Sequence, residues 1–248
     1  MIAVTVVVQG VTGGLVARLL GVARGNRSGS LVLGAGPVAR TLAGVLRDAG
    51  EEVVLVDSNP SSIRAAAQAG LHAVFGNGLE ERTLLRAGAE DRARALALTA
   101  NEEVNLLFAQ RCRGELRIPE VWVALRNTNV GITPKMVSDL QAHLLLGGAR
   151  DLAYWTVRLQ RGEAALEVWE VVDTEVEPAF PIDREEGERT LLPLAVERKG
   201  RVAPWDERTT LKPADRIHLV LLGAERPQAV KWLLRHGLRE TASGEDKG

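Results

Sequence analysis

The chain has 248 residues and a formal net charge of −1 at pH 7, with 46% hydrophobic and 25% charged side chains. This composition supplies enough apolar material for a packed core. The near-neutral balance provides no general surface for a polyanion, so we do not expect nucleic acid as a partner. The single cysteine, Cys112, excludes a disulfide framework and any Cys-based zinc site.

The N-terminal segment differs from the rest of the chain. Residues 1–17 carry no charged side chain, and Arg18, Arg24 and Arg27 follow them. At about 1.5 Å per residue, a helix over this run reaches roughly 25 Å, slightly short of a hydrocarbon core. One interpretation is a buried first strand over residues 3–9, rich in β-branched side chains. The other is the end of a final transmembrane helix, after which the positive-inside rule places the chain in the cytoplasm.

Short apolar runs alternate with helical patterns after a polar linker at residues 25–30. The predicted strands are 31–33, 53–56, 72–75, 95–98 and 121–125. Helices are predicted at 38–48, from 59–62 onward, at 79–87 and at 102–113. Continuously apolar strands spaced by helices indicate a parallel sheet covered on both faces. The expected fold class is therefore α/β, a Rossmann-type doubly wound parallel sheet.

The alternation of strands and helices weakens after Gly147. Residues 149–160 indicate one amphipathic helix, and the polar tail 241–248 is expected to be disordered. Strands at 191–197 and 216–222 and a helix at 228–236 predict a small C-terminal α+β domain. The resulting divisions are 1–27, 28–148 (the nucleotide-binding domain), 149–173 (a helix and a connecting strand) and 174–248.

The main motif is a GxGxxA sequence that follows the first strand and opens a helix: Gly34, Ala35, Gly36, Pro37, Val38 and Ala39. Its first glycine permits a tight turn, and its second lets phosphate oxygens approach the backbone. The helix N-terminus adds free N–H groups for an anion. Asp57 ends the next strand, 21 residues beyond Gly36, where a carboxylate accepts hydrogen bonds from ribose hydroxyls and repels a 2′-phosphate. A Rossmann shell that has lost its ligand is the alternative.

Further polar residues follow the carboxyl ends of the strands, where open α/β sheets bind ligands. We expect these to line a nucleotide cleft: Ser58, Asn77, Gly78, Thr99, Asn101 and Arg126. Arg126 is the candidate for a phosphate contact. Turn formation and helix capping are the alternative for the others, and Asn101 fits an N-cap equally well.

Catalytic machinery is not evident in the sequence. Tyr154, the only tyrosine, is followed four residues later by Arg158, where a short-chain dehydrogenase would need lysine. The four histidines are scattered, with no carboxylate or metal-ligand spacing around them. We therefore expect no enzyme, with a soluble NAD-dependent oxidoreductase as the alternative. A close His–carboxylate pair in a pocket would favour that alternative.

Taken together, these residues resemble the TrkA-type RCK (regulator of potassium conductance) family of cytoplasmic nucleotide-binding modules. The resemblance covers residues 31–125. It includes Ala87-Gly88-Ala89 and the segment 98–106, in which a threonine-ended strand precedes an acidic-Asn-Leu helix. Residues 192–222 resemble the small RCK C-terminal domain. Residues 1–22 resemble the end of the last helix of a sodium/proton antiporter of the cation:proton antiporter class.

Two departures from the family pattern concern the ligand. Gly76-Asn77-Gly78 replaces the family's Gly-Asp-Ala, which removes a carboxylate. Ala124 stands where some members carry a basic residue, two positions before Arg126, and this weakens the case for a triphosphate.

The resemblance implies a regulatory module at the cytoplasmic face of a membrane, acting on a monovalent cation transporter (K⁺ transport or Na⁺/H⁺ antiport). The implied ligand is NAD or NADH, or alternatively AMP, ADP or ATP. Implied partners are a membrane-embedded transporter domain and a second copy of the chain, in a homodimer or a higher RCK assembly. Residues 149–160 would be the crossover helix, with Trp155 and Leu159 as exposed dimer contacts. A ligand-free scaffold that only dimerises the transporter is a third possibility.

Overall fold

The computed structural model describes residues 27–126, 131–172 and 190–241. The predicted N-terminal strand or membrane helix, the first two residues of the linker at 25–30, the polar stretch at 174–189 and most of the tail lie outside these ranges. Among the described residues, no helix combines the length and the apolar character that a membrane span requires.

The first sheet has six parallel strands in the order β3-β2-β1-β4-β5-β6. They are β1 Ser30–Leu33, β2 Val53–Asp57, β3 His72–Phe75, β4 Arg94–Ala97, β5 Glu120–Val123 and β6 His143–Leu144. The strand order reverses between β1 and β4, and this is the switch point at which such sheets bind ligands. The predicted Rossmann-type fold is confirmed.

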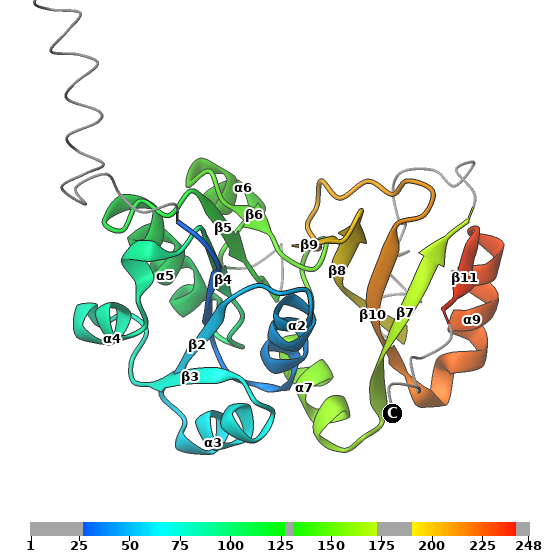
Figure 1. The fold of residues 1–248 in the computed structure, drawn as a ribbon, viewed down its shortest axis with the longest axis horizontal. Helices are drawn as coiled ribbons and strands as arrows, with labels where there is room; N and C mark the ends of the chain where they lie inside the picture. The colour runs from blue at the N-terminus through cyan, green and yellow to red at the C-terminus, as the bar shows by residue number, and fades with distance from the viewer. Residues whose placement is uncertain (1–26, 127–130, 173–189, 242–248) are drawn as a thin grey trace, which may run out of the picture.

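Helices cover both faces of this sheet (Figure 1). On one face lie α2 Pro37–Asp48, α3 Pro60–Gln68 and α7 Leu152–Gln160; on the other lie α4 Glu81–Arg86, α5 Glu102–Gly114 and α6 Pro134–Asp139. Side chains cap several of them: the side chain of Asn59 accepts from Ser61 N, and that of Asn101 accepts from Val104 N. Capping residues followed by proline or by acidic side chains fix these helix starts locally.

The sequence pattern did not predict α6 or β6. Strand β6 has only two residues and pairs with β5 through Trp122–His143 and Val123–Leu144. A two-residue strand carries no readable alternation, so only its position beside β5 makes it a strand.

The second sheet has five strands in the order β11-β7-β10-β8-β9, paired antiparallel. They are β7 Ala164–Val171, β8 Leu191–Arg198, β9 Arg201–Pro204, β10 Arg216–Leu222 and β11 Leu238–Glu240, with α9 Arg226–Arg235 packed on the sheet. Strand β7, which comes from the segment expected only to connect, lies inside this sheet beside β10.

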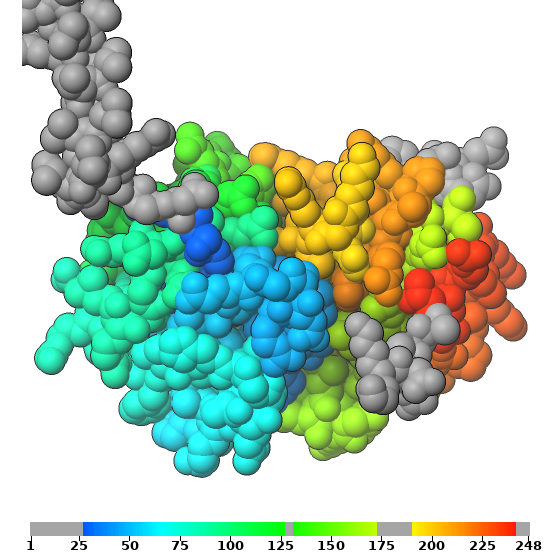
Figure 2. Space-filling view, viewed as in Figure 1, coloured from blue at the N-terminus to red at the C-terminus, as the bar shows by residue number. Residues whose placement is uncertain are grey.

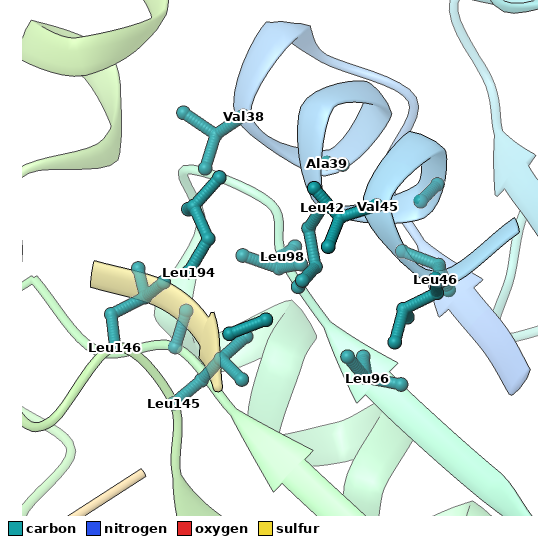
Figure 3. Packing of buried hydrophobic residues seen from close by; sticks show 14 of the residues in the cluster. Val38, Ala39, Leu42, Val45, Leu46, Leu96, Leu98, Leu145, Leu146 and Leu194 are labelled. Atoms are coloured by element: carbon teal, nitrogen blue, oxygen red, sulfur yellow. The ribbon is translucent and has the colours of Figure 1, made fainter. Parts of the chain in front are cut away.

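One hydrophobic cluster, the shared core, contains side chains of both sheets. Apolar side chains of α2 pack toward the ends of β4, toward Leu145 and Leu146, and toward Leu194 of β8 (Figure 3). In the space-filling view the blue atoms of α2 abut the yellow atoms of the second sheet (Figure 2). The lobes are therefore joined by buried apolar contact as well as by the chain.

The prediction that Trp155 is an exposed dimer contact is wrong. Trp155 is 1% exposed and belongs to the shared core, and Leu159 packs against that core. Helix α7 lies against α2 of the same chain. Amphipathic spacing identified the apolar face of this helix, but not whether the chain itself or a second copy covers it.

Candidate functional site

The glycine turn links β1 to α2 and requires glycine at its first position. Gly34 has φ +101°, and a Cβ atom there would stand 2.8 Å from Leu98 O. Gly36 caps α2 with extended backbone, φ −66° and ψ 170°, and a Cβ there would meet no atom within 4 Å. No side chain caps this helix start, so its first amides remain available to an anion. The turn is thus open where a phosphate would approach.

Asp57 lies against this turn, although the two are far apart in sequence. Its Oδ2 accepts a hydrogen bond from Ala35 N at 2.7 Å, and its Oδ1 accepts one from Asn59 N at 2.8 Å. Each carboxylate oxygen has two acceptor sites, so ribose hydroxyls can bind beside these amides. Ser58, the next residue, is exposed. Asp57 therefore fixes the turn and keeps acceptor positions that these two amides do not use.

Arg40 completes the turn and was missed by the sequence analysis. Its Nη1 donates to Ala35 O at 2.6 Å. Burial lowers the pKa of Arg40, and the nearby Asp57 carboxylate acts in the opposite direction. The guanidinium stays charged, since its ordinary pKa is far above neutral. A basic residue one helical turn after Gly36 was the available signal, because such a side chain points back toward the helix start.

Asn77 and Gly78 follow β3, and both stabilise the loop in which they lie. The exposed Asn77 accepts a hydrogen bond from Leu79 N through its side-chain oxygen at 3.0 Å. Gly78 is buried, and a Cβ there would collide with Leu33 Cδ1. Close packing against the end of β1 thus explains Gly78 without a ligand.

The loop after β4 is held by a buried amide. Asn105 is 0% exposed; its Oδ1 accepts from Thr99 N and Thr99 Oγ1, and its Nδ2 donates to Thr99 O and to Ala124 O. Asn101 caps α5. Asn105 therefore fixes the carboxyl ends of β4 and β5 beside the switch point. A polar residue four positions after the cap was the sequence signal that we did not use for the site.

Arg126 lies at the end of β5, with its side chain exposed and its backbone N–H donating to Glu102 Oε2 at 3.1 Å. Together with Thr99 and the buried Arg150, it lines a cavity of about 50 Å³. Ligand pockets measure about 300–1,000 Å³. This cavity is therefore too small to hold a nucleotide. Asn127, which follows, lies outside the described residues.

The histidines are less isolated than their spacing indicates. The fold brings His143 of β6 within 3.7 Å of Asp206 and 3.8 Å of Glu207. The sequence shows no carboxylate spacing around the histidines, but pairing between distant segments was left open, and the fold provides it at His143. It also provides it at His218, whose Nε2 lies 3.7 Å from Glu197 Oε2. These pairs join separate strands and loops, so sequence spacing cannot show them.

Comparison with known proteins finds similarity in the part of the chain that forms the first sheet. Residues 30–132 match the TrkA-N domain family. Over 97 residues the chain is 33% identical to the Ktr system potassium uptake protein A of Bacillus subtilis (strain 168). These 97 residues make up 39% of this chain and 43% of that protein. The chain thus spans less than half the length of this relative.

The chain is also similar to two solved structures, at low sequence identity. The TrkA-N domain of the inner membrane protein ybaL from Escherichia coli has a TM-score of 0.43 at 16% identity, covering 47% of this chain and 84% of that one. The GsuK channel bound to NAD has a TM-score of 0.42 at 16% identity, covering 90% of this chain and 41% of that one.

The TrkA-N match contains the glycine turn, Asp57 and every other residue of the candidate site up to Arg126. It confirms the TrkA-type resemblance for this segment. The antiporter resemblance of residues 1–22 falls outside the described residues and stays a prediction.

Proposed function

We propose that this chain is a nucleotide-sensing regulatory module of a monovalent cation transporter. The observation that carries the proposal is the open glycine turn with Asp57 bonded to it, inside the segment that matches the TrkA-N family. The potassium uptake protein that it resembles supports K⁺ as the transported ion; Na⁺/H⁺ antiport is the second possibility.

The ligand that best fits this turn is NAD or NADH. Amides at the start of α2 and the Arg40 guanidinium suit a pyrophosphate, and Asp57 suits an adenosine ribose without a 2′-phosphate. AMP, ADP or ATP would use the same groups. Ligand binding would regulate transport only through different affinities for two arrangements of the assembly.

The proposed assembly is a homodimer or a higher RCK assembly attached at the cytoplasmic face of the membrane-embedded transporter. With Trp155 buried, exposed apolar side chains on another face of the chain are the better candidates for self-contact. Leu85 of α4, Leu107 of α5 and Met136 of α6 are 49%, 50% and 41% exposed. Sedimentation of a Leu85→Glu, Leu107→Glu double variant tests this: a dimeric wild type and a monomeric variant support it.

One observation supports the alternative function, an NAD-dependent oxidoreductase. His143 does lie near two carboxylates. However, β6 stands three strands from β1, and His143 is not among the residues that line the cavity beside Thr99 and Arg126. This distance favours regulation over hydride transfer.

Calorimetric titration of the 248-residue chain with NAD, NADH, AMP, ADP and ATP tests the proposal. We expect micromolar binding of one nucleotide, weakened at least tenfold by Asp57→Asn and unchanged by Asp48→Asn. Asp48 is the matched control, because it lies exposed at the far end of α2. Thermal unfolding of each variant is measured alongside, since Asp57 also holds Ala35 N and Asn59 N.

Absence of binding by all five nucleotides at millimolar concentration would contradict the proposal and favour the scaffold that only dimerises. Oxidation of bound NADH by a carbonyl substrate, abolished by His143→Gln, would favour the oxidoreductase.

A further inference from the structure

Three potential metal ligands meet at the seam between the two lobes. His143 lies on β6 of the first sheet, and Asp206 and Glu207 lie in the loop that follows β9 of the second. His143 Nδ1 is 3.7 Å from Asp206 Oδ2 and 3.8 Å from Glu207 Oε1. One ligand atom from each of the three residues lies within 4.8 Å of the other two. Each side chain is partly buried, with 15–30% of its surface exposed.

The two carboxylates are held in place by bonds from their surroundings. Asp206 Oδ1 accepts from Arg208 N and Thr209 Oγ1, each at 3.0 Å. Asp206 Oδ2 also receives Trp122 Nε1 at 3.3 Å. Glu207 Oε2 accepts from Leu144 N at 2.7 Å, which leaves Oε1 toward His143. These hydrogen bonds orient the unused acceptor positions of the two carboxylates toward one point. Hydrogen bonds to metal ligands commonly orient the ligands in this way.

The imidazole nitrogen at this point has no hydrogen-bond partner. His143 Nδ1 is buried and unpaired among the described residues. Its distances to the two carboxylate oxygens are too long for hydrogen bonds. They suit two ligands of one ion, because zinc binds nitrogen and oxygen at about 2.0–2.2 Å and so separates two ligands by at most roughly 4.3 Å.

We propose that His143, Asp206 and Glu207 bind a divalent first-row transition cation, for which Zn²⁺ is the probe. A neutral imidazole and two carboxylates carry a charge of −2, which the ion balances. The nitrogen ligand favours such ions over Mg²⁺ and Ca²⁺, which prefer oxygen ligands alone. Three protein ligands leave a coordination position for water.

One neighbouring cation competes for the site. Arg208 Nε lies 3.6 Å from Glu207 Oε1, but the Arg208 side chain is 68% exposed. Exposed pairs of this kind contribute little free energy, so the guanidinium can leave when the ion binds.

The bound ion would fasten the two lobes together. The same seam contains the bridge between Leu145 and Asp206 and the hydrogen bond from Leu146 N to Trp205 O at 2.7 Å. Because the ligands come from both lobes, the ion binds only the docked arrangement and stabilises it by mass action. Metal binding here is separate from nucleotide binding and requires none of the glycine-turn residues.

Calorimetry and metal analysis of the chelator-treated 248-residue chain test the proposal. We expect one Zn²⁺ per chain with micromolar or tighter affinity and no comparable binding of Mg²⁺. His143→Gln and Glu207→Gln should each weaken binding at least tenfold, and His72→Gln, which alters an exposed histidine of β3, should not. Glutamine at 207 keeps an acceptor for Leu144 N, so this variant retains the loop contact.

A second measurement on the wild type avoids dependence on the variants. Zn²⁺ at about 100-fold above its Kd should raise Tm by roughly 5–10 °C. It should also slow hydrogen exchange of the segment 143–146. Failure of Zn²⁺ to bind, equal affinity in the wild type and in both ligand variants, or unchanged exchange at 143–146 would each overturn the proposal.

Discussion

Replacing the two glycines of the turn by alanine should separate folding from ligand binding. At Gly34 the methyl group would stand 2.8 Å from Leu98 O, and the positive φ adds strain. We expect Gly34→Ala to cost about 2–4 kcal/mol of unfolding free energy, from left-handed backbone strain of about 1–2 kcal/mol and the enforced backbone shift.

Gly36→Ala should behave differently, because its backbone suits alanine and the space around it is empty. Alanine lowers the conformational entropy of the unfolded chain, and this raises the free energy of unfolding by about 0.4–1 kcal/mol. The preference of helix N-caps for glycine over alanine offsets that gain. Stability should therefore change by less than about 0.5 kcal/mol. The methyl group would nevertheless occupy the approach of the phosphates, so nucleotide affinity should fall at least tenfold, about 1.4 kcal/mol.

The assay combines urea unfolding with calorimetric titration of the preferred nucleotide. Gly44→Ala is the matched control: Gly44 lies inside α2, its added Cβ meets no atom within 4 Å, and it is remote from the turn. Its variant should be more stable by up to about 1 kcal/mol, with unchanged affinity. If Gly36→Ala bound the nucleotide as tightly as the wild type, the ligand would not approach this turn, and the reasoning would be refuted.

Three further predictions concern single side chains. Asn105→Ala should lower the unfolding free energy by about 2–4 kcal/mol in urea titration, because it leaves Thr99 N and Ala124 O without their bonds; a loss below 1 kcal/mol would contradict this. Burial lowers the pKa of His218 in the folded chain. As the pH drops below about 6.5, His218 is therefore protonated in the unfolded chain before it is protonated in the folded chain, and the free energy of unfolding should fall. His218→Gln should flatten this dependence in unfolding curves at pH 5.5–7.5. Burial raises the pKa of Cys112 to about 12, so a thiol reagent at pH 8 should react only after unfolding; rapid labelling of the native chain would show the packing to be wrong.

Local features of the sequence predicted most of the first lobe. The apolar runs, the glycine turn after β1 and the caps at Asn59 and Asn101 each act within a few residues, so their effects can be read in order along the chain. The TrkA-type resemblance of residues 31–125 depended on the same local motifs, and the family match to residues 30–132 confirms it. Ligand binding at Asp57 and its neighbours stays a prediction, which the titrations above test.

Contacts between segments far apart in the sequence could not be predicted from local patterns. The sequence alone determined that a helix with an apolar face lies within 149–160, where the structure has α7 from Leu152 to Gln160, and that a glycine turn follows β1. Only the tertiary structure decided that Trp155 is buried under α2, that β7 joins the second sheet, and that His143 meets Asp206 and Glu207. The physical reason is that helices, turns and caps depend on hydrogen bonds and periodicity between near neighbours. Burial and side-chain pairing across a seam depend instead on how complete elements dock, which no local spacing encodes.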